Sequence, residues 1–191
     1  LILLCAGICL GALALIFAYG NHSWGVFLGY LQSGFLLVIN ILPAVVLLFF
    51  LYGLVGRAWL AFLLDGAIVL GLSLGHYFKL VFRDDPLYFE DMLILREAKA
   101  MAGSDHYALF IDKRIVVALL CWALGTVLLF FLVRGKARGW KRRLGTVLAA
   151  VAVSAVVAPV YLDESRYDSV ENYAYLNRWA ATQDYISHGF F

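Results

Sequence analysis

Residues 35–54 read FLLVINILPAVVLLFFLYGL, an apolar stretch without a single charged side chain. A helix of about 20 such residues is long enough to cross the roughly 30 Å hydrocarbon layer of a bilayer. The backbone must be helical there, because lipid offers no hydrogen-bond partner to exposed peptide groups. The stretch therefore predicts a transmembrane helix. Asn40 and Pro43 within it predict a kink and a polar contact with a neighbouring helix.

Four more apolar runs repeat this pattern, and the five runs together comprise residues 2–19, 35–54, 59–80, 115–133 and 144–162. Of the 191 residues in the chain, 64% are hydrophobic and 15% are charged. A soluble domain is roughly half apolar and about a quarter charged, so the surplus apolar surface of this chain must face lipid. The sequence predicts an all-α membrane protein with five transmembrane helices in a domain of residues 1–162.

Basic residues predict how the helices are oriented. Residues 134–143, RGKARGWKRR, lie between the fourth and fifth runs and carry six cations and no acid. Short loops rich in Lys and Arg stay on the cytoplasmic side. Arg57, between the second and third runs, falls on the same side by alternation. We therefore expect the N-terminus inside the cell membrane and the C-terminal tail outside.

Two outer segments carry helix signals of their own. In residues 82–114, Asp85 is a suitable N-cap for a helix that begins at Pro86, and the apolar residues that follow predict an amphipathic helix on the membrane surface. Residues 163–191 contain a second pattern of helical spacing with an aromatic-rich face. We expect them to form a juxtamembrane linker that leads into an extracellular domain.

The best candidate for a binding site is Lys79-x-x-x-Arg83-x-x-Pro86-Leu87-x-x-x-Asp91, at the outer end of the third run. Lys79 and Arg83 share a helical face because they are four residues apart. Cations near the headgroup layer can hold lipid phosphate, and arginine can do so with two hydrogen bonds. The same side chains can instead reach the interface and pair with neighbouring acids, including Asp91. The residues alone favour this second, structural interpretation.

Asp65 is the one acid inside a predicted span. An ionisable group there is costly and usually faces the interior of the bundle. It can form a structural hydrogen bond to Asn40 or to a group such as Ser73, or it can couple a proton or an ion. The structural interpretation is favoured, because a lone acid without a basic partner deep in the membrane argues against a transporter.

The sequence lacks the common motifs of soluble enzymes. It contains no P-loop, no glycine-rich dinucleotide turn, no HExxH, no CxxC and no GxSxG, and its histidines have no metal-ligand spacing. We therefore assign no catalytic residue, no metal site and no nucleic-acid partner to these residues.

Three stretches resemble the membrane domain of the lipoteichoic acid synthase family, the sulfatase-like phosphoglycerol transferases. They are GRAW at residues 56–59, the motif from Lys79 to Asp91, and WAATQDYISHGF at residues 179–190. The chain departs from the family pattern at two positions where asparagine is usual. It has His76 three residues before Lys79, and His188 near the end of the third stretch.

The resemblance implies five spans followed by an extracellular sulfatase-fold domain in the bacterial cell membrane. This chain would then be the membrane anchor and lipid platform of an enzyme that takes glycerol phosphate from phosphatidylglycerol to build lipoteichoic acid or a related envelope polymer. Its partners would be membrane lipids, their anionic headgroups and the protein's own catalytic domain. In the family a threonine nucleophile and a divalent metal, commonly manganese, act in that domain. Two other interpretations stay open, a small transporter or flippase coupled through Asp65 and a non-enzymatic envelope scaffold.

Overall fold

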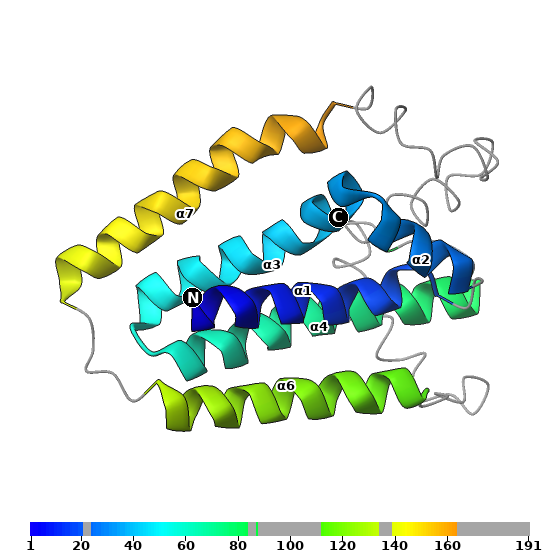
Figure 1. Ribbon diagram of the computed structural model, residues 1–191, viewed down its shortest axis with the longest axis horizontal. Helices are drawn as coiled ribbons and strands as arrows, with labels where there is room; N and C mark the ends of the chain where they lie inside the picture. Colours follow the sequence, from blue (N-terminus) through cyan, green and yellow to red (C-terminus); the bar gives the residue numbers. More distant parts are fainter. Residues whose placement is uncertain (21–23, 84–86, 88–111, 134–138, 164–191) are drawn as a thin grey trace.

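The structure is a computed structural model that describes residues 1–20, 24–83, 87, 112–133 and 139–163. Throughout this part of the chain the regular structure is helical, which confirms the all-α prediction. The helices are α1 (Ile2–Ala18), α2 (Trp24–Gln32), α3 (Gly34–Val55), α4 (Ala58–Arg83), α6 (Lys113–Leu132) and α7 (Trp140–Tyr161). The long helices run along the long axis of the molecule (Figure 1).

Four of these helices, α3, α4, α6 and α7, are long and apolar enough to cross a membrane. Each of them coincides with one of the predicted runs. The first run forms α1, which is equally apolar but only 17 residues long. Its crossing of the membrane stays a prediction, as does the orientation of the chain. We call the end where α4 stops and α6 starts the outer end, following the predicted orientation.

Local signals explain the boundaries of α3. The Ser33 side chain caps its first turn by accepting a hydrogen bond from the Leu36 N–H at 3.3 Å. Gly56 ends it with a backbone φ of +75°, a left-handed conformation that glycine adopts without steric cost. Helix α4 begins two residues later. The first two residues of the GRAW stretch, Gly56 and Arg57, therefore form a tight turn between two antiparallel helices, and Ala58 and Trp59 begin α4.

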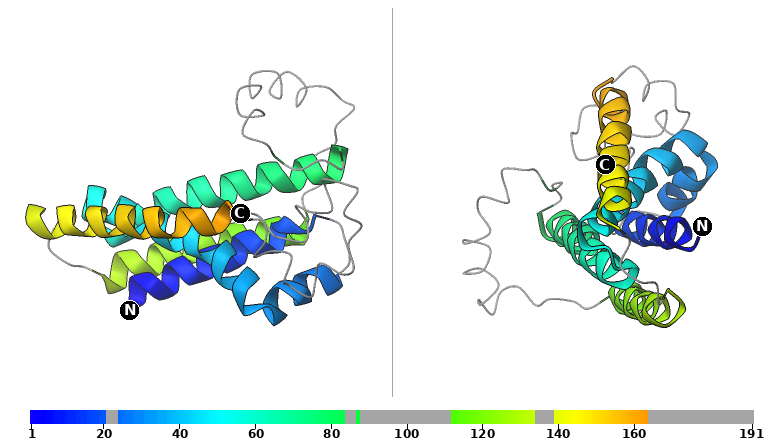
Figure 2. Two further views of the ribbon diagram at one scale, coloured as in Figure 1. Left: turned by 90° about the horizontal axis from the view of Figure 1, so that it is seen from above. Right: turned by 90° about the vertical axis from the view of Figure 1, so that its left-hand side faces the viewer.

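The centre of the bundle consists of α1, α3 and α4, whose buried apolar side chains form a continuous core. Helices α1 and α3 approach closely at Gly11, where an added Cβ would lie 2.9 Å from the Ile41 Cα. Helix α6 packs against α4, and α7 packs against α3 on the opposite side of the bundle (Figures 1 and 2).

Two hydrogen bonds attach α7 to α3, one near each end. The Tyr161 hydroxyl donates to the Ile39 carbonyl oxygen at 2.5 Å, and the Arg143 Nε donates to the Gly53 carbonyl oxygen at 3.0 Å. Most of the apolar side chains of α7, such as Val156, are exposed. A surface of this kind is suited to lipid and not to water.

Candidate functional site

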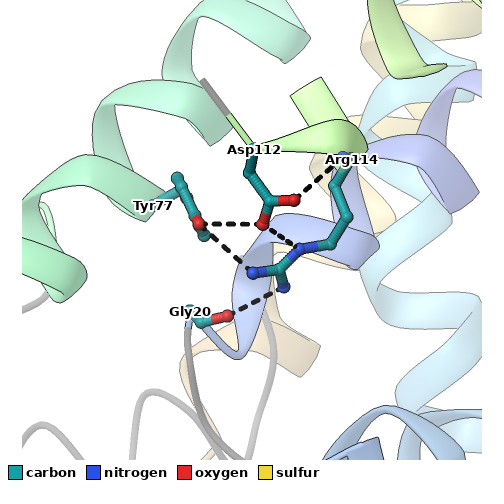
Figure 3. Close-up of polar contacts among 4 residues, drawn as sticks. All are labelled: Gly20, Tyr77, Asp112 and Arg114. Atoms are coloured by element: carbon teal, nitrogen blue, oxygen red, sulfur yellow. Dashed lines mark hydrogen bonds and ion pairs between the residues drawn. The ribbon is translucent and has the colours of Figure 1, made fainter. Parts of the chain in front are cut away.

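The outer end of the bundle holds a polar cluster centred on Asp112, the N-cap of α6 (Figure 3). One carboxylate oxygen, Oδ1, accepts a hydrogen bond from the Arg114 backbone N–H at 3.1 Å. The other, Oδ2, accepts from the Arg114 Nε at 2.6 Å and from the Tyr77 hydroxyl at 3.1 Å. Asp112 therefore caps its own helix and binds α4 at the same time.

Arg114 extends the cluster to the end of α1. Its Nη1 donates to the Gly20 carbonyl oxygen at 2.9 Å, and its Nη2 donates to the Tyr77 hydroxyl at 3.2 Å. The guanidinium carbon also lies 5.4 Å from the ring centroid of Tyr19 and 5.1 Å from that of Tyr77, within the range of a cation–π interaction. Three segments that are distant in sequence, at the ends of α1 and α4 and at the start of α6, are thus joined through one side chain (Figure 3).

The electrostatics of this cluster favour the ion pair. Burial by itself raises the pKa of the Asp112 carboxyl, but the hydrogen bonds from Arg114 and Tyr77 outweigh burial and lower the pKa from its ordinary value. The side chains of Arg114 and Asp112 are 25% and 27% exposed, so water screens the pair in part. The cluster contains no activated nucleophile. Its hydrogen bonds join the ends of three helices, α1, α4 and α6.

The sequence analysis did not identify this cluster. Asp112 directly before an apolar run has the pattern of an N-cap, and that signal was available. Its contact with Tyr77 spans 35 positions in the sequence, and the contact of Arg114 with Gly20 spans 94. No local pattern indicates pairs of this kind.

The predicted headgroup site lies at the same end. Helix α4 continues to Arg83, so Lys79 and Arg83 do lie on one helix, and Lys79 is half-buried. The side chain of Arg83, the residues Pro86 and Asp91, the amphipathic helix expected after them and the linker expected at 164–191 all lie outside the described residues. The binding role of these residues stays a prediction.

Leu87 contacts α4 through its backbone. Its backbone N–H donates to the His76 Nδ1 at 3.2 Å. His76 precedes the last residue of α4 by seven positions, or about 10 Å of helix. Leu87 therefore lies beside α4 at the level of His76, about two turns before the last residue of the helix. His76 occupies the position where the resembled family usually has asparagine, another side chain that can accept a backbone N–H.

Asp65 is fully buried on α4, as expected of an acid that faces the bundle interior. The hydrogen bond expected from Asn40 or a Ser73-type group is not formed. Asn40 donates to the Leu36 carbonyl oxygen at 2.9 Å, and Ser73 donates to the Val69 carbonyl oxygen at 2.7 Å. Among the described residues, neither carboxylate oxygen of Asp65 has a hydrogen-bond partner.

The antiparallel packing explains why Asn40 does not reach Asp65. Asn40 lies in the second turn of α3, which starts at the outer end of the bundle. Asp65 lies in the second turn of α4, which starts at the inner end. The two side chains are therefore in opposite halves of the bundle.

No protein-family model, curated protein or solved structure matches the chain. Within the described ranges, no three His, Cys, Asp or Glu side chains come together as a group that could hold a metal ion.

Proposed function

We propose that this chain is the membrane platform of a sulfatase-like phosphoglycerol transferase, and that the outer end of α4 seats the anionic headgroup of its lipid substrate. One observation carries the proposal, the hydrogen bond from the Leu87 N–H to His76. It brings Leu87, a later residue of the motif, against α4, the helix that carries Lys79. The resemblance to the family rests in part on this same motif.

The neighbouring polar cluster supports the proposal by giving that site a rigid base. Arg114 and Asp112 connect the outer ends of α1, α4 and α6, so the end of α4 has defined neighbours. A headgroup site needs such a base, because a phosphate contact is productive only when the cations are held in place.

Lys79 and Arg83 would supply the charge in this site. The Lys79 ammonium would act as a point charge and the Arg83 guanidinium as a two-pronged donor to the phosphate oxygens. The transfer of glycerol phosphate would belong to the extracellular domain implied by the resemblance, with its threonine and a divalent metal such as manganese. This chain would bind and present the lipid.

Lipid retention tests the proposal on the chain itself. The protein is placed in nanodiscs of phosphatidylglycerol mixed with phosphatidylcholine, and the lipids that it retains are counted by native mass spectrometry. A lost charge-assisted hydrogen bond weakens binding by about tenfold or more, so Lys79→Ala and Arg83→Ala should each reduce the preference for phosphatidylglycerol by about that factor.

Lys113→Ala is the matched control, because Lys113 is an exposed lysine at the start of α6 on the same end of the bundle. It should leave the preference unchanged. An equal loss in Lys113→Ala would indicate nonspecific charge attraction, and an unchanged preference in the Lys79/Arg83 double variant would refute the headgroup role. In an enzyme that includes the catalytic domain, the double variant should lower turnover of phosphatidylglycerol without lowering expression.

A further inference from the structure

Asp65 is fully buried on α4, beside residues of the main apolar core. Ala61 and Val69, one turn before and after it on α4, are buried in the main apolar core. That core continues into Leu10 of α1 and Leu48 of α3. Asp65 itself has no exposed surface, and its two carboxylate oxygens lack hydrogen-bond partners among the described residues.

Among the described residues, no charged side chain of the packed helices forms a hydrogen bond with Asp65. The titratable groups at α1 are the Leu1 amino group, Cys5, Cys9 and Tyr19, and the one on α3 is Tyr52. Those on α6 are Lys113, Arg114 and Cys121, and those at α4 are Arg57, just before its start, His76, Tyr77, Lys79 and Arg83 at its outer end. None of these donates a hydrogen bond to Asp65. The three cysteines are exposed, and both cations of α6 lie at its first turn, at the outer end.

The free energy of burial decides the chemical form of such a carboxyl. Burying an isolated carboxylate in an apolar medium costs far more free energy than the whole stability of a folded domain, so the protein cannot hold that charge without a partner. A neutral carboxylic acid costs only the much smaller penalty of an unpaired polar group.

We propose that Asp65 is a proton-binding site within the bundle, which takes up a proton from the inner aqueous phase to become a carboxylic acid and releases it there as a carboxylate. The reaction is the addition of one proton to one carboxylate, and it needs no other reactant. This inference is independent of the proposed lipid platform, because it uses neither Lys79 nor the outer motif.

The position of Asp65 on α4 indicates the inner end as the route. Asp65 is seven residues from Ala58, about 10 Å of helix, whereas Arg83 at the outer end is about 27 Å away. The outer end is also closed by the hydrogen bonds of Arg114 to Tyr77 and Gly20.

The contacts between α4 and α6 in the inner half of the bundle are weaker than those at the outer end. The rings of Trp59 and Phe130 meet edge to face at 5.6 Å, and the Trp122 Nε1 donates to the Phe62 carbonyl oxygen at a long 3.3 Å. A ring pair and a long hydrogen bond separate at a smaller cost than a charge-assisted network.

Infrared difference spectroscopy of the protein in lipid tests the proton site, with wild type compared against Asp65→Asn. At neutral pH the wild type should show the C=O stretch of a protonated carboxylic acid that Asp65→Asn lacks. The band should shift in D₂O, and it should give way to a carboxylate band as the pH is raised. Ser73→Ala is the control, since it removes another buried polar group of α4 and should leave the band in place.

Two results would overturn the inference. A carboxylate band at neutral pH would mean that Asp65 is ionised and paired, and an acid band insensitive to both alkali and D₂O would mean a permanently sealed acid. If Asp65→Asn does not fold, labelling of the wild type with an apolar carbodiimide, located by mass spectrometry, replaces the comparison. Labelling of Asp65 that falls as the pH rises supports the site, and labelling that is absent or independent of pH refutes it.

Discussion

Gly66→Ala should separate α4 from α6 next to Asp65. The Trp122 indole lies directly on Gly66, and a Cβ added there would sit 2.0 Å from its Nε1 and 2.3 Å from its Cδ1. No real contact is that short, so the ring must move. Its movement breaks the hydrogen bond from Trp122 to the Phe62 carbonyl oxygen.

The expected cost follows from these two losses. Forcing extra volume into a packed contact costs about 1–3 kcal/mol, and a lost hydrogen bond adds about 1 kcal/mol. Gly66→Ala should therefore lower the free energy of unfolding by about 2–4 kcal/mol. Gly71→Ala is the matched control on the same helix, because nothing lies within 4 Å of its added Cβ. It should be neutral or stabilise α4 by up to about 1 kcal/mol, because alanine is the better helix former.

A double-mutant cycle in detergent, with denaturant unfolding followed by circular dichroism, separates the ring contact from other effects of the substitution. In a Trp122→Ala background the clash is gone, so Gly66→Ala should behave like Gly71→Ala. The reasoning is refuted if Gly66→Ala is as stable as Gly71→Ala, or if its cost stays the same without the indole.

Two further predictions concern the ends of the bundle. The lowered pKa of Asp112 implies stability that is present above its unfolded pKa of about 3.9 and is lost as the pH falls through the folded value. The free energy of unfolding, measured from neutral to acidic pH, should therefore decline less steeply in Asp112→Asn than in wild type. Parallel curves for the two proteins would contradict the role of Arg114 and Tyr77 as donors to Asp112. The predicted orientation places Lys113 outside and Lys141 inside. In a cysteine-free background, a membrane-impermeant thiol reagent should label Lys113→Cys in intact cells and Lys141→Cys only after lysis, and the reverse pattern would invert the topology.

The membrane helices could be predicted because hydrophobic length is a local property of the chain. The run at 59–80 corresponds to α4 at Ala58–Arg83, and the run at 115–133 corresponds to α6 at Lys113–Leu132. Each boundary depends on a nearby residue, such as Asp112 at the start of α6. The short helix α2 was missed because its nine residues, Trp24–Gln32, are too few for a membrane span.

The burial of Asp65 can be predicted from its neighbours in sequence, whereas its hydrogen-bond partners cannot. Burial follows from the cost of placing a carboxyl in lipid, which needs only the position of Asp65 within an apolar run. A partner depends on which helices are neighbours and at what depth each polar group lies. Asn40 and Asp65 are both near the start of their helices in sequence, and the antiparallel turn at Gly56 is what places them in opposite halves of the bundle.

Arg143 has two roles, and the sequence analysis used only one of them. It is one of the six cations in residues 134–143 from which the orientation is predicted. That prediction depends on the number of cations and not on the position of any one of them. In the structure its Nε donates to the Gly53 carbonyl oxygen, and its guanidinium lies beside Gly56, where a Cβ would be 3.1 Å from Nε. A cation at the C-terminal end of α3 also interacts favourably with the helix dipole. One of the charges behind the predicted orientation therefore also joins α7 to α3. We expect replacement of Arg143 to weaken both the predicted orientation and the α7–α3 contact, whereas the exposed Lys141 contributes only to the predicted orientation.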